Sequence, residues 1–123
     1  MFQTSTSKEE LMIDKSNKIP TKNALLAIPV ATAKVSGFTN EELMEGGSHL
    51  ISKWVSIGMY VGTQLGASAS DMAHVFKRSV ATGHQGVNRA KARVTLNDDD
   101  VIRAVNAIDK EVRLILENEK HYV

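Results

Sequence analysis

A long apolar stripe that ends at a glycine constrains this chain more than any other feature. The stripe consists of Leu50, Trp54, Ile57, Val61 and Leu65, which follow one another at steps of three or four residues. This spacing places their side chains on one face of a helix. Gly66 follows directly, and glycine is the residue at which helices most often end. The pattern predicts a central buried helix over residues 49–65 and a tight turn after it.

A second helix is expected immediately after this turn. Ser68 or Ser70 can cap its N-terminus. Its core face would consist of Met72, Val75, Phe76 and Val80. We expect the helix to run to about Ala81 and to stop at Gly83, with residues 84–96 forming a loop or a short helix.

Local capping signals predict further helices on both sides of this pair. Thr39 and Glu42 stand at capping-box spacing, which predicts a helix that begins at Asn40. An earlier helix is expected to start near Pro29. Asn97 is followed by three aspartates, a capping side chain and then acids at the positive end of a helix. The last helix, residues 98–120, carries a heptad seam of Val101, Val105, Ile108, Val112 and Ile115.

These elements predict an all-α fold: a small single-domain bundle of four to five helices. The length of 123 residues agrees with one domain. Residues 1–22 are polar and are expected to form a flexible N-terminal arm, and residues 23–123 to form a single helical domain. Ile102 and Leu116 broaden the seam of residues 98–120 beyond what one neighbouring helix would cover. We therefore expect a homodimer through this C-terminal helix.

The corner at residues 58–78 also matches the requirements of a DNA-binding unit. Gly62 is small at the point where the second helix would cross the first, and Gly66 lies at the turn. In this respect the stretch resembles helix-turn-helix regulators, which place their second helix in the major groove. The outward residues would be Ser68, Ala69, Ser70, Ala73, His74 and Lys77, short or hydrogen-bonding side chains that can approach base edges. An ordinary structural corner between two helices fits much of the same pattern.

Charge is unevenly distributed along the chain. Residues 72–97 carry Lys77, Arg78, Arg89, Lys91 and Arg93 without any acid, for a net charge of +5. Residues 1–71 have a net charge of −1 and residues 98–123 of −3. A basic block of this kind predicts contacts with phosphates, which fix a protein on DNA without reading its sequence. The alternatives are a solvated basic face, or pairing of these bases with the acidic last helix.

Several other functions are not indicated. The chain has no cysteine, which excludes a disulfide framework and a thiolate metal site and fits a reducing compartment. The four histidines show no metal-ligand spacing, so we expect no metal and no cofactor. No serine or acid pair stands out as a nucleophile or a general acid and base, so an enzyme is not expected.

Neither a membrane span nor a secretory signal is expected. Lys53 and Gln64 interrupt the apolar stretch over residues 50–69, which therefore does not predict a span of about 20 apolar residues. The N-terminus has no basic start followed by an apolar run, so no secretory signal is expected and the predicted location is the cytoplasm.

The sequence thus predicts a binding protein for double-stranded DNA, a small transcriptional or replication regulator. The residues predicted to contact DNA are Ser68, Ser70, His74, Lys77, Arg78, Arg89, Lys91 and Arg93. The alternative is a non-enzymatic helical interaction or assembly protein, either a structural subunit or an inhibitor, that binds a protein partner.

Overall fold

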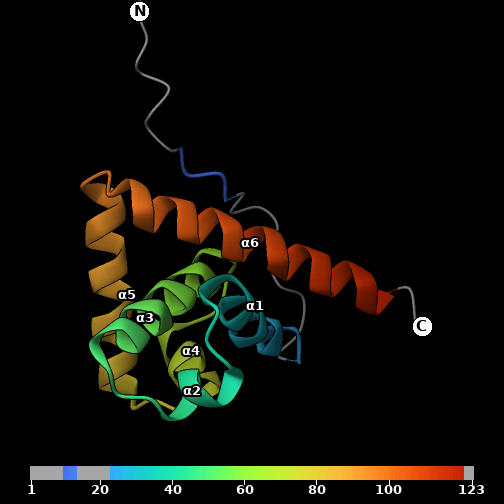
Figure 1. The fold of residues 1–123 in the computed structure, drawn as a ribbon, viewed down its shortest axis with the longest axis horizontal. Coiled ribbons are helices and arrows are strands. Elements are labelled where there is room, and N and C mark those ends of the chain that lie inside the picture. Colours follow the sequence, from blue (N-terminus) through green and yellow to red (C-terminus); the bar gives the residue numbers. More distant parts are fainter. Residues whose placement is uncertain (1–9, 14–22, 121–123) are drawn as a thin grey trace, which may run out of the picture.

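The computed structural model describes residues 10–13 and 23–120. These residues form six α-helices and one short 3-10 helix, with no strand among them (Figure 1). In chain order the elements are η2 (Asn23–Leu26), α1 (Ala27–Ser36), α2 (Asn40–Glu45), α3 (His49–Gln64), α4 (Ala69–Val75), α5 (Val80–Thr95) and α6 (Asp99–Lys120). The all-α prediction is confirmed, although the described residues form more helices than the four to five expected.

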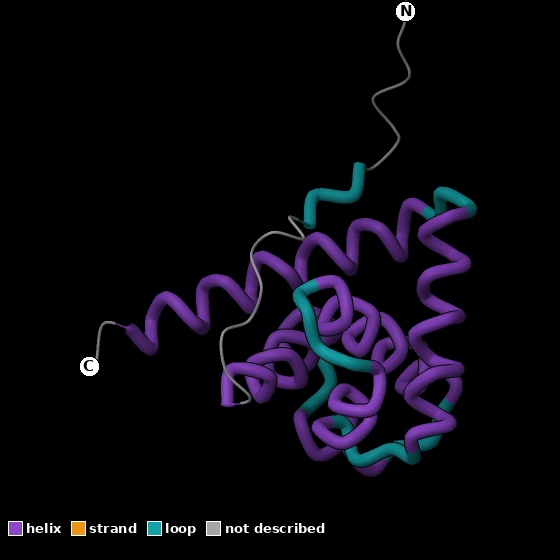
Figure 2. The backbone as a smooth tube through the Cα atoms, turned by 180° about the vertical axis from the view of Figure 1, so that it is seen from behind, coloured by secondary structure: helices purple, strands orange, loops and turns teal. Residues whose placement is uncertain are grey.

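Helix α3 is the centre of the fold. It packs against α1, α2, α4, α5 and α6, and all of its residues from Val55 to Gly62 are buried. Helix α6 runs across one side of the other helices and meets the end of α5 at a corner (Figure 1). Seen from behind, the C-terminal end of α6 projects beyond the rest of the fold (Figure 2).

The helix starts follow from local side-chain caps. Thr39 and Glu42 form the predicted capping box of α2. The hydroxyls of Ser48, Ser68 and Ser79 accept the backbone N–H three residues further on, at α3, α4 and α5 respectively. A polar side chain at this position satisfies one of the N–H groups that the first helical turn leaves unpaired.

Three helices end in the same left-handed turn. Gly66 after α3, Lys77 after α4 and Asn97 after α5 have φ angles of 105°, 56° and 60°. In each turn the next residue reaches back along the helix; after α4, for example, the Arg78 N–H donates to the Ala73 carbonyl at 2.8 Å. Only the first of these turns contains a glycine, so the sequence did not mark the other two. Helix α4 ends at Val75, and the prediction that the second helix continues to Ala81 is wrong.

The prediction of a loop or short helix over residues 84–96 is also wrong. Helix α5 runs through Gly83 and Gly86 without interruption. A Cβ atom on Gly83 would lie 2.6 Å from the Cβ of Ala73, and one on Gly86 would lie 2.5 Å from Cε of Met59. These glycines allow α5 to lie directly against α4 and α3, so they serve close packing and do not break the helix.

The contact between α3 and α4 depends on a small residue, as the sequence indicated. A Cβ atom on Gly62 would collide with the side chain of Met72, which is fully buried. Ala73 was expected on the outward face of α4, but it is fully buried beneath Gly83 of α5. Helix α4 is thus covered by α3 and by α5.

The seam of α6 is covered within the single chain. Val101, Val105, Ile108 and Val112 are at most 1% exposed, and α6 packs against α1 and α3. Ile102 is only 3% exposed, and Leu116 is partly buried against the core. The argument that these two residues require a second subunit is therefore wrong.

Part of the predicted N-terminal arm lies against α6. The Met12 N–H donates to Oδ1 of Asn106 at 2.8 Å, and Nδ2 of Asn106 donates to the Glu10 carbonyl at 2.7 Å. The other residues of the predicted arm, 1–9 and 14–22, lie outside the described residues. In the part of the chain that the structure describes, no helix has both the length and the apolarity to cross a membrane.

Candidate functional site

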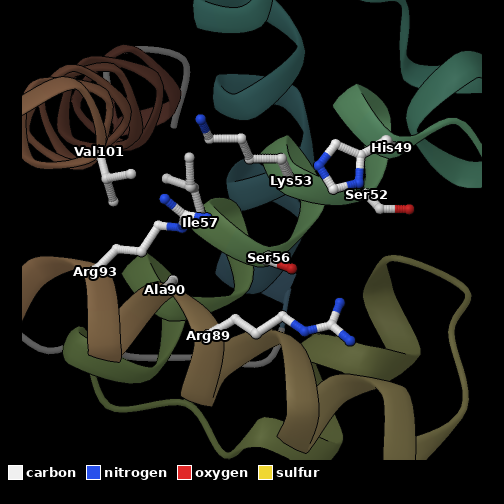
Figure 3. Close-up of a pocket in the computed structure, with 9 residues that line it drawn as sticks. All are labelled: His49, Ser52, Lys53, Ser56, Ile57, Arg89, Ala90, Arg93 and Val101. Carbon is white, nitrogen blue, oxygen red and sulfur yellow. The ribbon is translucent and has the colours of Figure 1, made fainter. Parts of the chain in front are cut away.

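A pocket of about 80 Å³ lies between α3, α5 and the start of α6 (Figure 3). It is lined by His49, Ser52, Lys53, Ser56, Ile57, Arg89, Ala90, Arg93 and Val101. The three apolar residues of this set, Ile57, Ala90 and Val101, are each at most 3% exposed. They form the apolar part of the lining, and the other lining residues are basic or carry hydroxyl groups.

The two long helices bring these basic side chains together. His49 and Lys53 stand one helical turn apart on α3, and Arg89 and Arg93 stand one turn apart on α5 (Figure 3). Residues four apart on a helix share a face. A Cβ atom on Gly86 would lie 3.0 Å from Oγ of Ser56, so the close approach of α5 to α3 sets the width of the pocket.

One carboxylate partly compensates the positive charge. Oδ2 of Asp98 lies 3.3 Å from Nη1 of Arg93. Oδ1 of the same carboxylate accepts the Val101 N–H at 3.3 Å, just before α6 begins. This backbone hydrogen bond is the main cause of a lowered Asp98 pKa. Arg93 and Lys53 lower that pKa further, and partial burial opposes them.

The remaining polar groups of the pocket are unpaired. In the described part of the chain, Lys53 and Arg89 have no carboxylate within ion-pair distance, and the hydroxyls of Ser52 and Ser56 make no hydrogen bond. Three cations thus stand against the single carboxylate of Asp98, which leaves a net charge of +2. Like charges on neighbouring helices repel one another, and bound anions would reduce this repulsion.

Arg89 and Arg93 are the predicted DNA contacts that line this pocket. Lys91 is exposed on α5 between them. Arg78 has a different environment: its guanidinium donates to the carbonyls of Leu43, Met44 and Gly46 at 2.8, 2.6 and 3.0 Å, and to that of Phe76 at 2.9 Å. It stabilises the C-terminal end of α2, and its burial lowers the pKa of Arg78.

The predicted contacts on α4 form a separate surface. The Ser68 hydroxyl is engaged as the cap of α4, where it accepts the Asp71 N–H at 3.0 Å. Ser70 and His74 are exposed one turn apart, and Lys77 is exposed in the turn that follows. None of these side chains lines the pocket. The predicted set is therefore divided between an α4 surface and the pocket.

Sequence reasoning missed the contribution of α3 to the pocket. Lys53 belongs to residues 1–71, which have a net negative charge. Ser52 and Ser56 lie on the helix predicted to be buried at the centre of the fold. The spacing of His49 and Lys53 on a helix without acids could have indicated a basic face. Their proximity to Arg89 depends on a contact between residues far apart in the sequence.

In the described residues, no cluster of three or more histidine, aspartate or glutamate side chains could hold a metal ion. No protein-family model and no curated protein matches this chain.

Proposed function

We propose that this protein binds double-stranded DNA and acts as a small transcriptional or replication regulator. The observation that carries the proposal is that Lys53, Arg89 and Arg93 line one pocket, whose net charge with Asp98 is +2. Cationic side chains on neighbouring helices can neutralise backbone phosphates, and this term supplies nearly all of the non-specific affinity for DNA. The pocket would position the protein on DNA without reading its sequence.

Sequence reading is assigned to the outer surface of α4. Ser70 and His74 are exposed there, and a hydroxyl and an imidazole can hydrogen-bond to base edges. The opposite side of α4 is anchored by Met72 and Ala73, both fully buried. This arrangement supports the assignment, because one side of α4 holds the helix in the core and the other side presents polar groups to the solvent.

A homodimer through the C-terminal end of α6 completes the proposal. Leu114 is 43% exposed and Ile115 beside it is only partly buried, so they form a small apolar patch on α6, whose C-terminal end projects from the fold (Figure 2). A twofold dimer would bring this patch against itself, and it could present two α4 surfaces to one DNA face. Light scattering tests this step, because a mass near 13.4 kDa at all concentrations would contradict it.

The pocket is tested by fluorescence anisotropy with labelled duplexes over a range of salt concentrations. Arg89→Ala should weaken binding to all sequences, and it should flatten the plot of log affinity against log salt by about one unit, since about 0.9 counterions are released per phosphate contact. Arg103→Ala is the matched control, because Arg103 is an exposed arginine on α6 that pairs with Asp100. An unchanged slope for Arg89→Ala would remove the pocket from the DNA interface.

The second candidate function is a helical interaction or assembly protein that binds a protein partner. The partly exposed apolar residues at the projecting end of α6 favour it, because apolar patches on soluble proteins commonly mark protein interfaces. Selection from a random duplex pool, followed by sequencing, separates the two functions. An enriched motif supports the DNA regulator, whereas a pool without enrichment favours the protein partner.

A further inference from the structure

We infer that a second copy of this chain docks on the exposed face of α6, with the two α6 helices running in opposite directions and Leu114 at the twofold axis. This arrangement rests on the homodimer of the proposed function. It goes beyond that homodimer because it fixes the direction of the two helices and names the charged residues that select the partner. It does not depend on DNA binding.

The exposed face of α6 carries an apolar residue between two opposite charges. Lys110, Leu114 and Glu117 are exposed, and they follow one another at steps of four and three residues. This spacing places their side chains on one face of the helix, about one turn apart. Leu114 is therefore flanked by a cation on its N-terminal side and by an anion on its C-terminal side.

The two flanking charges are not compensated within the described part of the chain. Lys110 and Glu117 form no ion pair there. The charges beside them do form pairs, since Glu111 lies 3.1 Å from Lys34 of α1 and Arg113 pairs with an aspartate of α6 itself. Lys110 and Glu117 are therefore the charges on this face that a partner can pair with.

The order of these charges selects the direction of the partner helix. In a parallel twofold pair of α6 helices, like residues face one another, so the two Lys110 ammonium groups repel and the two Glu117 carboxylates repel. In an antiparallel pair centred on Leu114, Lys110 of each chain meets Glu117 of the other. Because a twofold axis makes each such contact twice, the antiparallel pair gains two ion pairs.

Leu114 is not the only exposed apolar side chain in this part of the fold. Ile115 beside it is only partly buried. On α1, Val30 is 45% exposed and stands one turn before Lys34, whose ion pair with Glu111 joins α1 to α6. The C-terminal end of α6 projects beyond the rest of the fold (Figure 2). An apolar contact here would supply affinity, and the flanking charges would fix the orientation.

Charge reversal tests the direction of the helices, with sedimentation equilibrium of the full chain at low salt as the measurement. Lys110→Glu and Glu117→Lys each turn two attractive contacts into two repulsive ones, so each should weaken dimerisation about tenfold. The double variant exchanges the two charges and should recover the wild-type affinity. An equimolar mixture of the two single variants should form a mixed dimer more tightly than either variant dimerises alone, because every contact in it is attractive.

Lys91→Glu makes the same charge change at an exposed lysine of α5 and is the control, which should dimerise like the wild type. Far-UV circular dichroism is measured for each variant. Because Lys110 and Glu117 are exposed, their substitution should leave the helix content unchanged.

Disulfide crosslinking locates the twofold axis independently of charge. The chain has no cysteine, so Leu114→Cys introduces a single thiol. A residue at the axis faces its own copy, and two cysteines whose Cβ atoms lie about 4 Å apart can form a disulfide. Leu114→Cys should therefore give a covalent dimer on oxidation, whereas Lys91→Cys should remain a monomer on a non-reducing gel.

The outcomes separate this interface from the rest of the proposed function. Wild-type dimer affinity in both Lys110→Glu and Leu114→Asp would overturn the interface and leave the homodimer in place. Weak single variants without recovery in the double variant would overturn the antiparallel direction. A wild type with a mass near 13.4 kDa at all concentrations would overturn the interface and the homodimer together, whereas DNA binding is decided separately by Arg89→Ala.

Discussion

Helices α5 and α6 follow one another in the chain but pack by opposite means. Helix α6 contacts the core through branched aliphatic side chains, among them Val105 and Ile108. Helix α5 contacts its neighbours through Gly83, Gly86 and Ala90, which are all buried. One helix is held mainly by apolar area removed from water, whereas the other is held by a close approach of backbones. Apolar periodicity therefore predicted α6 and missed most of α5.

The two helices also differ in how their charges are compensated. On α6, Arg103 pairs with Asp100, Arg113 pairs with Asp109, and Glu111 pairs with Lys34 of α1. Helix α5 contains no acid, and its close packing brings Arg89 and Arg93 beside Lys53 of α3. The cations that α5 contributes to the pocket thus outnumber the carboxylates beside them, whereas these charges on α6 form pairs.

The largest expected effect concerns the aliphatic contact of α6. Ile108→Asp would bury a carboxylate at a fully buried position without any cationic partner among the core residues around it. We expect a loss of about 4 kcal/mol or more in the free energy of unfolding, a large part of the total for a domain of this size. Circular dichroism during thermal unfolding measures it, and Leu114→Asp, on the exposed end of the same helix, should change little. Similar stability of the two variants would show that α6 is not held by its seam.

An intermediate effect is expected at the glycine contact of α5. Alanine is favoured over glycine in a helix by about 1 kcal/mol, but a Cβ on Gly83 would lie 2.6 Å from Cβ of Ala73 and 2.9 Å from the Ala69 carbonyl oxygen. Because a backbone atom cannot move aside easily, Gly83→Ala should lower the free energy of unfolding by about 1–3 kcal/mol. Gly47→Ala, where nothing lies within 4 Å of the added atom, is the control for urea unfolding. A more stable Gly83→Ala variant would mean that α5 does not approach α4 so closely.

The smallest effect is expected at Asp98, where α5 and α6 meet. Its pKa is lowered below the ordinary value of 3.8, first by the Val101 N–H and then by Arg93. A lowered pKa in the folded state means that the charged carboxylate stabilises the fold above pH 3.8, and that this contribution is lost as the pH falls through the folded pKa. Asp98→Asn should therefore be less stable at pH 7 by less than about 1 kcal/mol, as is usual for a surface pair.

This deficit of Asp98→Asn should shrink as thermal unfolding is repeated from pH 7 down to pH 2.5. A deficit that stays constant over this range would assign the effect to the shape of the side chain and not to its charge. A deficit that grows at low pH would contradict the direction of the pKa shift.

Much of the fold could be predicted because its signals are local. The capping box of Thr39 and Glu42, the caps Ser48 and Ser68, and the left-handed turn at Gly66 each involve residues within one or two helical turns. The stripe of α3 and the seam of α6 are repeats within one helix. Backbone hydrogen bonding and apolar periodicity act over these short distances. The sequence by itself therefore determined the all-α class, the central helix and the start of α2, and it limited the cap of α4 to Ser68 or Ser70.

The tertiary structure decided the features that depend on contacts between distant residues. The turns after α4 and α5 contain Lys77 and Asn97, non-glycine residues in left-handed conformations that cost about 1–2 kcal/mol each. The packing of neighbouring helices offsets that cost. Arg78 caps α2 because residues more than thirty positions away lie beside it. The pocket exists because Gly86 lets α5 approach α3. No local pattern could reveal that Lys53 and Arg89 line one pocket, because only the packing of α3 against α5 puts both residues there.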